Sequence, residues 1–277
     1  MRSIIRTLVP CAMVALVALL LAATAAGRAT AALLSALPPR DYVVGTYDGA
    51  ELQLYVNGRL VASSRTTGRI DRTPASLEIG SYVGHAIWDG TIDEVAIYDR
   101  ALAPSLIGAR YRLGLNVGSG GSSYETSVMQ TPGLVGYWRL DDHGRVATDA
   151  TQRNNGIYTG GVSQGHAGLI AGNPDTAVLF NGRAGSVHIS PSHSLEFSKA
   201  FTLEAWVTTV TIGNRAIIAR PGSYFLETDV LGQWGVGVWT AGTLRSVYSR
   251  FAARAPTPAS LSSGSNGAFL FAGHESS

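Results

Sequence analysis

Two adjacent carboxylates, Asp93 and Glu94, stand in the middle of a segment that reads TIDEVAIYD. Apolar residues alternate with other residues along this segment, which predicts a β-strand, and successive side chains of a strand point to opposite faces. The alternation puts Asp93 on the same face as Val95 and Ile97. If that face lies in the core, the Asp93 carboxylate needs hydrogen bonds, an ion pair or a bound metal to offset the cost of burial.

The sequence offers little support for catalysis. Asp93 and Glu94 are neighbours on one strand, so they are expected to point to opposite faces and not to act as a pair. The six histidines show no metal-ligand spacing, and neither an H-E-x-x-H motif nor a Walker-type phosphate loop occurs. We therefore expect a protein that is not an enzyme.

Aromatic side chains could provide flat faces for sugar rings. The candidates are Trp88, Trp138, Trp206, Trp234, Trp239, Tyr224 and Tyr248. Aromatic residues near strand ends also pack in cores and along edges, so none of them is assigned as a sugar platform. Trp88 stands beside Asp89-Gly90 and is the one expected to lie nearest a loop.

Charge argues against nucleic acid as a partner. The chain carries 21 Lys and Arg against 19 Asp and Glu, a net charge of +2 at pH 7. This excess is too small to indicate binding to nucleic acid or to an anionic membrane surface. The sequence also shows no run of arginines interleaved with aromatic residues, which is typical of nucleic-acid binding proteins.

The N-terminus has the features of an export signal. Two arginines precede an apolar run over residues 7–26, which ends in the small residues Ala23-Thr24-Ala25. This layout predicts a signal peptide over residues 1–26 and a secreted, extracellular protein. The alternative is an uncleaved anchor, because about 20 apolar residues can span a bilayer. Cys11 is the only cysteine, so the exported chain would have no disulfide.

The elements around Asp93 read as strands joined by tight turns. Leu52, Leu54 and Val56 alternate with other residues, and Asn57-Gly58 then turns the chain into a second strand. The segments TYDGAELQLYVNGRLVA and TIDEVAIYDRAL resemble the second half of a LamG-like (laminin G, concanavalin A-like) jelly-roll domain. Further along, GLVGYWRLDDHG, AVLFNGRAGSVHI and FTLEAWVTT resemble the first half of such a domain.

This resemblance implies an all-β protein with a concanavalin A-like, two-sheet jelly-roll sandwich. The expected organisation is a signal peptide at 1–26, a spacer at 27–40, the C-terminal half of a LamG-like domain at 41–113, a flexible linker at 114–131, the N-terminal half at 132–249 and a disordered tail at 250–277.

Because the second half precedes the first, two arrangements stay open. The halves form one composite sandwich in permuted order, or they are two incomplete domains cut from a tandem array. The composite arrangement predicts that the strand at 91–99 pairs with the strand at 134–141. It also predicts that the hairpin at 51–62 shares a core with residues 201–207. Each half alone would leave apolar faces and strand edges in water.

The resemblance also implies a structural calcium ion. In LamG-like domains and related glucanases, an Asp at the place of Asp93 commonly helps to hold calcium, which takes several oxygen ligands. Asp141 and Asp149 lie in regions that would approach Asp93 in a composite sandwich. In the alternative interpretation, Asp93 accepts hydrogen bonds from backbone N–H groups and the other two are turn residues. The E-x-D-x-x-E motif of glucanases is absent.

Three classes of function follow. The first is a non-catalytic extracellular module that binds carbohydrate and holds a structural calcium. The second is an adhesion module that binds a cell-surface protein. The third is a hydrolase or the truncated remnant of a larger LamG-like protein; the missing carboxylate motif argues against the hydrolase.

Overall fold

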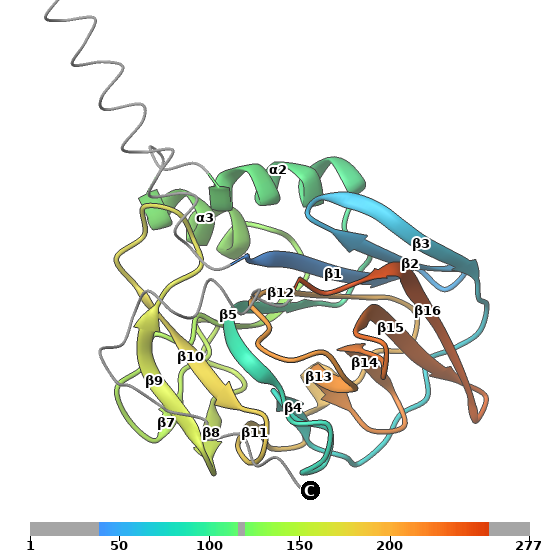
Figure 1. The fold of residues 1–277 in the computed structure, drawn as a ribbon. Helices are drawn as coiled ribbons and strands as arrows, with labels where there is room; N and C mark the ends of the chain where they lie inside the picture. Colours follow the sequence, from blue (N-terminus) through green and yellow to red (C-terminus); the bar gives the residue numbers. More distant parts are fainter. Residues whose placement is uncertain (1–38, 116–119, 255–277) are drawn as a thin grey trace, which may run out of the picture. The chain divides into compact units, whose positions relative to one another are not determined.

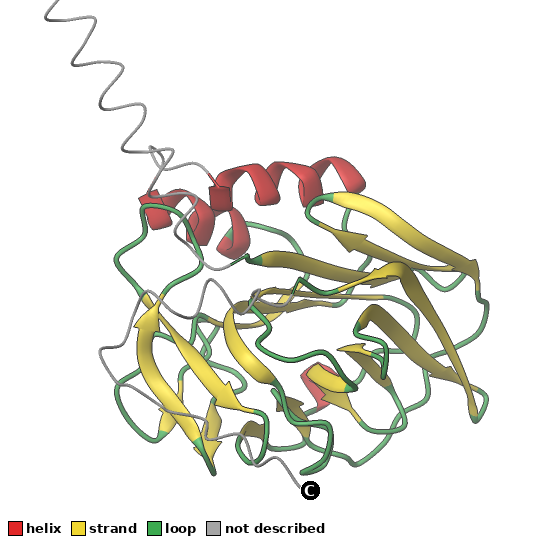
Figure 2. Cartoon of the chain, in the orientation of Figure 1, coloured by secondary structure: helices red, strands yellow, loops and turns green. Residues whose placement is uncertain are grey.

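The structure, a computed structural model, describes residues 39–115 and 120–254. Two antiparallel sheets face each other (Figure 1, Figure 2). This arrangement confirms the expected all-β, two-sheet sandwich. The described residues all belong to one compact unit that begins at Pro39.

The first sheet, sheet A, has the strand order β3-β2-β1-β12-β5-β10-β9, and β6 also pairs with β5. Its strands are β1 (Asp41–Tyr47), β2 (Glu51–Val56), β3 (Arg59–Arg65), β5 (Asp89–Tyr98), β6 (Leu134–Trp138), β9 (Val162–Ala167), β10 (Thr176–Asn181) and β12 (Phe201–Val207).

The second sheet, sheet B, has the order β16-β15-β14-β13-β4-β11-β8-β7. Its strands are β4 (Leu77–Ile79), β7 (Val146–Ala147), β8 (Gly156–Thr159), β11 (Ser186–Ile189), β13 (Arg215–Arg220), β14 (Tyr224–Thr228), β15 (Gln233–Thr240) and β16 (Thr243–Ala252). The helices among the described residues are α2 (Pro104–Leu115), α3 (Gly120–Met129) and the 3₁₀ turn η1 (His193–Leu195).

Both halves of the chain contribute strands to each sheet. In sheet A, β5 pairs with β6 through Val95 and Trp138, and β1 pairs with β12 over its whole length. In sheet B, β4 lies between β11 and β13. Leu54 of the β2–β3 hairpin and Leu203 of β12 belong to the same core cluster. Both contacts predicted for a composite sandwich are therefore present.

The core between the sheets is made from the inward side chains of both. On β15, Val236 and Val238 point inward and are fully buried. Gly45 of β1 lies against Val236, and a Cβ at Gly45 would come within 2.4 Å of that side chain. The two sheets are thus packed too closely at this point for any residue larger than glycine.

A second core lies on the outer face of sheet A, beneath α2 and α3. Trp206 of β12 stacks on Tyr42, with ring centroids 5.1 Å apart. Arg110 of α2 forms an ion pair of 2.6 Å with Glu204 of β12, and both side chains are inaccessible to solvent. The Glu204 carboxylate also accepts hydrogen bonds from the hydroxyls of Tyr42 and Tyr98. This network attaches α2 to the sheet.

The expected flexible linker over 114–131 is corrected by the structure. Residues 120–129 form α3, in which Tyr124 and Val128 are buried. These two residues lie four positions apart and so share one face of the helix. Arg110 Nη2 donates hydrogen bonds to the Ser127 carbonyl and to Thr131 Oγ1, which fix the C-terminal end of α3.

The expected alternation along β5 is also wrong at one point. Glu94 has a backbone φ of +55°, and the register between β5 and β12 shifts there, which marks a β-bulge. Ile92, Val95 and Ile97 all face the inter-sheet core. Asp93 contacts the backbone of Leu169, which belongs to the cluster beneath the helices. The bulge therefore puts Asp93 on the face opposite Val95.

Some of the predicted segments lie outside the residues that the structure describes. The signal peptide at 1–26, nearly all of the 27–40 spacer and the tail from residue 255 lie outside them. The tail was expected to begin at residue 250, but β16 continues to Ala252. In the described part of the chain, no helix has the length and apolar character needed to cross a membrane.

Candidate functional site

The outer face of sheet B carries a hollow of about 410 Å³ over β14, β15 and β16. Residues from β14, β15, β16 and two nearby loops line it. They are Tyr82, His85, Ala86, Asn214, Phe225, Glu227, Trp239, Leu244 and Tyr248. Four of these nine are aromatic residues other than histidine, which is the lining expected of a surface that stacks on flat ligands.

Two alternate glycines of β15 lie beneath rings that line the hollow, and we call this pair the glycine floor. Strand β15 reads QWGVGVWT, so its valines face the core and Gly235 and Gly237 face outward. In the register of the sheet, Gly237 lies opposite Phe225 and Gly235 lies opposite Tyr248. A Cβ at Gly237 would lie 2.2 Å from the Phe225 ring, and one at Gly235 would lie 2.3 Å from the Tyr248 ring. The missing side chains thus allow both rings to lie across β15.

Trp239 and Tyr248 keep part of their surface in solvent. Both side chains are half-buried, whereas Phe225 is 3% exposed. Phe225 supports Trp239 through an edge contact with centroids 5.5 Å apart and planes at 70°. Trp239 and Tyr248 are therefore held in place by the sheet and still available to a ligand.

Glu227 supplies the polar group beside these rings. The Tyr248 hydroxyl donates a hydrogen bond of 2.7 Å to Glu227 Oε1. Burial raises the pKa of Glu227, and the charge of Asp229 adds to this effect, while the hydrogen bond from Tyr248 acts against it. Among the residues that line the hollow, Glu227 is the single carboxylate.

The other aromatic candidates do not reach the surface. Trp88, Trp138, Trp206, Trp234 and Tyr224 are each at most 1% exposed. Trp88, expected near a loop, stacks on Trp234 in the inter-sheet core with centroids 6.1 Å apart. Trp88 does lie in the loop just before β5, as expected, but its side chain points into the core and is not exposed. The glycine floor went unrecognised because GVGVW shows the outward glycines but not which rings oppose them.

The predicted metal ligand Asp93 belongs to a buried carboxylate cluster with Glu94 and Asp175. The cluster forms where β5 changes partner, pairing with β10 as far as Ile92 and with β6 from Val95. Asp175 stands just before β10, and the bulge brings Glu94 to the same side as Asp93. The expectation that Asp93 and Glu94 point to opposite faces is therefore wrong.

Arg139, just after β6, is the cation of this cluster. Its Nη2 lies 2.7 Å from Asp175 Oδ2 and its Nε lies 3.8 Å from Glu94 Oε1. The backbone N–H of Leu169 donates to Asp93 Oδ2 at 2.6 Å, and the Tyr137 hydroxyl donates to Glu94. Burial raises the pKa of Asp93 and of Glu94 well above the usual values.

The three predicted calcium ligands, Asp93, Asp141 and Asp149, have different partners in the structure and do not form one site. Asp93 Oδ1 is buried without a hydrogen-bond partner, so it retains an oxygen that could ligate a cation. Asp141 approaches the cluster only through Arg139, at 3.3 Å, and is partly exposed. Asp149 accepts hydrogen bonds from the backbone N–H groups of residues 137, 151, 153 and 154, as a loop-forming residue does. No group of three or more His, Cys, Asp or Glu side chains in the described ranges is arranged to hold a metal ion.

Two arrangements resemble parts of catalytic sites. Residues 161–165 read GVSQG, the spacing of a nucleophile elbow, and Ser163 Oγ lies 2.9 Å from His166 Nε2. Both side chains lie on strand β9 and not in the strand-to-helix turn that such a nucleophile requires. Glu227 and Asp229 match two positions of the glucanase motif, but Gly232 stands in the third. Neither arrangement provides a complete set of catalytic groups.

A family model described as the concanavalin A-like lectin/glucanases superfamily matches residues 21–108. No curated protein and no solved structure matches the chain. Laminin G-like domains bind glycans or proteins and are typically extracellular and non-catalytic, whereas the superfamily also includes glucanases. The match covers β1 to β5, of which β1, β4 and β5 pair with strands from the second part of the chain. The match covers less than half of the chain, and it agrees with the two-sheet sandwich that the structure shows.

Proposed function

We propose that this protein is a non-catalytic, extracellular carbohydrate-binding module whose sugar site is the hollow on sheet B. The observation that carries the proposal is the half-exposed pair Trp239 and Tyr248, with Tyr248 packed over Gly235 and Trp239 held by the edge of Phe225. Sugar rings bind through their apolar faces to aromatic side chains and through their hydroxyls to nearby polar groups. Glu227, His85 and Asn214 are the polar groups in reach of such a ligand.

The lining supports binding rather than hydrolysis. Glycoside hydrolysis uses two carboxyl groups on opposite sides of the bond that breaks. Glu227 lines the hollow, whereas Asp229 Oδ1 accepts hydrogen bonds from the N–H groups of Leu231 and Gln233 in the following turn. With one carboxylate at the sugar site, the hollow can orient a glycan but lacks the second group that hydrolysis needs.

The calcium ion remains part of the proposal, with Asp93 as its ligand. Asp93 Oδ1, which is buried without a hydrogen-bond partner, would supply one oxygen ligand. The ion would offset the charge of the Asp93 carboxylate where β5 changes its pairing from β10 to β6. Its role would be structural, because the cluster lies beneath the helices and the hollow lies on the other sheet.

The test is a glycan array probed with the purified protein and with Trp239→Ala. The wild-type protein should bind a defined set of glycans, and the substitution should weaken that binding about tenfold or more because it removes a stacking face. Val230→Ala, at a position 73% exposed in another loop, is the matched control. Equal binding by wild type and Trp239→Ala, with equal melting temperatures, would refute this site.

A second candidate function is protein adhesion, and one observation favours it. Two loops carry exposed large apolar residues, which are Val210 and Ile212 in one loop and Val230 and Leu231 in the other. Ile212 lies against Gly232, the residue after Leu231, so the two loops are in contact. Apolar side chains gathered on a surface often mark protein contacts. A pull-down of cell-surface proteins, repeated with Ile212→Ser, would support adhesion if capture depended on this patch and the glycan array stayed blank.

A further inference from the structure

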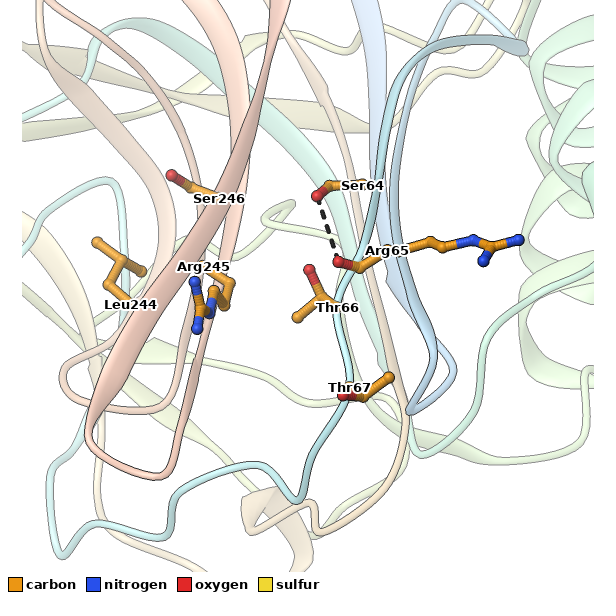
Figure 3. A pocket seen from close by; sticks show the side chains of 7 residues that line it. All are labelled: Ser64, Arg65, Thr66, Thr67, Leu244, Arg245 and Ser246. Carbon is orange, nitrogen blue, oxygen red and sulfur yellow. Dashed lines mark hydrogen bonds between the residues drawn. The ribbon is translucent and has the colours of Figure 1, made fainter.

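The open side of the sandwich between β3 and β16 carries a groove. These are the edge strands of sheets A and B, and the two strands lie beside each other in opposite directions. Three hollows follow one another along them, with volumes of about 520, 550 and 360 Å³. The first is shown in Figure 3, with residues 64–67 on one wall and residues 244–246 on the other.

The walls of this groove are rich in arginine. The arginines are Arg59, Arg65, Arg245, Arg250 and Arg254. All five are exposed, and none forms an ion pair with a carboxylate among the described residues. Asp41 is the one carboxylate in the lining, and its Oδ1 accepts a hydrogen bond from Asn57. The groove is therefore much more positive than the net charge of +2 would indicate.

Strand β16 connects this groove to the sugar site. Leu244 lines both the first hollow of the groove and the aromatic hollow, and Tyr248 lines both the second hollow and the aromatic hollow. Arg245 precedes Tyr248 by three residues and Arg250 follows it by two, or about 10 and 7 Å along a strand. Arg65 extends to the far side of β3, away from Arg245, so the β16 arginines are the closer to the sugar site (Figure 3).

We propose that the ligand is an acidic polysaccharide, whose rings stack on Trp239 and Tyr248 while its acid groups bind Arg245 and Arg250 across the edge of β16. This inference rests on the proposed carbohydrate-binding function and names the class of its ligand. Guanidinium groups bind carboxylates and sulfates through two parallel hydrogen bonds, which makes arginine suited to either acid group. The acid groups would lie at the edge of β16, clear of the Glu227 carboxylate.

A structural explanation competes with this one. Charged residues on edge strands prevent edge-to-edge aggregation, and Arg245 lies opposite the inward-facing Val238, where such a charge is effective. Edge protection explains a charge on β16 and requires no ligand. It does not require the arginines to flank an aromatic hollow, and it predicts that their loss changes solubility and leaves glycan binding unaltered.

The experiment measures binding of the full chain to polygalacturonate, dextran sulfate and neutral dextran by affinity electrophoresis, at low and high salt. Polygalacturonate and dextran sulfate distinguish carboxylate from sulfate as the recognised group. Arg245→Gln and Arg250→Gln should each weaken binding to the preferred acidic polymer about threefold, and the double variant about tenfold, the range of exposed charge pairs. Arg183→Gln, an exposed arginine in the turn after β10, is the control.

The outcomes separate the two proposals. Salt-sensitive binding of an acidic polymer that falls in the arginine variants and in Trp239→Ala supports the inference. Equal binding of neutral dextran and acidic polymers, unchanged in the arginine variants, overturns it and leaves the carbohydrate-binding function standing. The inference is also overturned if Trp239→Ala leaves the binding of acidic polymers unchanged. It is likewise overturned if single-stranded DNA binds as tightly as the acidic polysaccharides. Failure to bind any polysaccharide or array glycan refutes the proposed function itself.

Discussion

At the scale of single residues, positions without a side chain matter as much as the aromatic ones. Gly235 and Gly237 determine how closely Tyr248 and Phe225 approach the sheet. Phe225 in turn holds Trp239 by an edge contact. The position of the exposed Trp239 ring thus depends on Phe225 and on Gly237 beneath it, neither of which needs to contact the ligand. Substitutions in the floor should therefore affect binding and stability together.

Gly237→Ala should weaken glycan binding and destabilise the protein by about 1 to 3 kcal/mol, the usual range for overpacking. The new Cβ would overlap the Phe225 ring at 2.2 Å and displace it. Urea unfolding measures the stability, and the glycan array measures the binding. Gly144→Ala is the control, since a Cβ there meets no atom within 4 Å. Unchanged binding by Gly237→Ala would show that the rings over β15 are not the sugar platform.

Glu227 should make stability depend on pH. Because burial raises the pKa of Glu227 above the value of 4.5 expected in the unfolded chain, the folded protein binds the proton more tightly. Its contribution to stability is present below pH 4.5 and is lost as the pH rises through the folded pKa. Glu227→Gln should therefore be more stable than wild type at neutral pH, with the difference disappearing toward pH 4. A difference in melting temperature that is constant with pH would contradict this.

Asp93 decides the calcium proposal. If the cluster binds calcium, chelation should lower the melting temperature of the wild-type protein, because a ligand that binds only the folded state stabilises it. Asp93→Asn should remove most of this effect by deleting the charge of the carboxylate that would ligate the ion. Asp149→Asn is the contrasting variant, and it should destabilise the loop with and without chelator, since the carboxylate accepts backbone hydrogen bonds. Identical wild-type melting curves with and without chelator would rule the ion out.

At the scale of elements, the strands were predictable and their irregularities were not. Alternating apolar residues and the Asn57-Gly58 turn predict the β2–β3 hairpin, which the structure confirms. The bulge at Glu94 depends on one backbone angle and on a change of partner strand, which no local pattern encodes. Helix α3 was missed because its sequence, GGSSYETSVM, is small and polar like a linker. It forms because Tyr124 and Val128 are buried against the sheet.

Helix α2 should depend on the buried ion pair beneath it. Arg110→Met leaves the Glu204 carboxylate fully buried with only tyrosine hydroxyls as partners. Removing one member of a buried pair typically costs about 3 to 5 kcal/mol. Urea unfolding should show this loss, and the double variant Arg110→Met/Glu204→Gln should recover part of it. Exposed Arg112→Met on the same helix is the control. A loss below about 1 kcal/mol would show that the pair does not fix α2.

At the scale of the whole molecule, the two parts of the chain complete each other's sheets. Strand β12 lies between β1 and β5, and β4 lies between β11 and β13. The sugar site lies on β14 to β16, while a loop of the earlier part contributes Tyr82 and His85 to it. The groove is similarly shared, with β3 from one part and β16 from the other. The proposed binding surfaces therefore exist only when both parts are assembled.

Residues 39–115 and 120–254, expressed as separate chains, should each fail to fold. Each would expose strand edges and one face of an apolar core, and the burial left would be too small to offset chain entropy. On mixing, the pairs β1–β12, β5–β6 and β4–β13 can form, and the Arg110–Glu204 ion pair joins the two chains. Circular dichroism and cooperative thermal melting should therefore appear only in the mixture, together with binding to the glycans that the full chain selects. Cooperative melting of either fragment alone would show that one part is an independent domain, and the shared sheets would then not be needed for its folding.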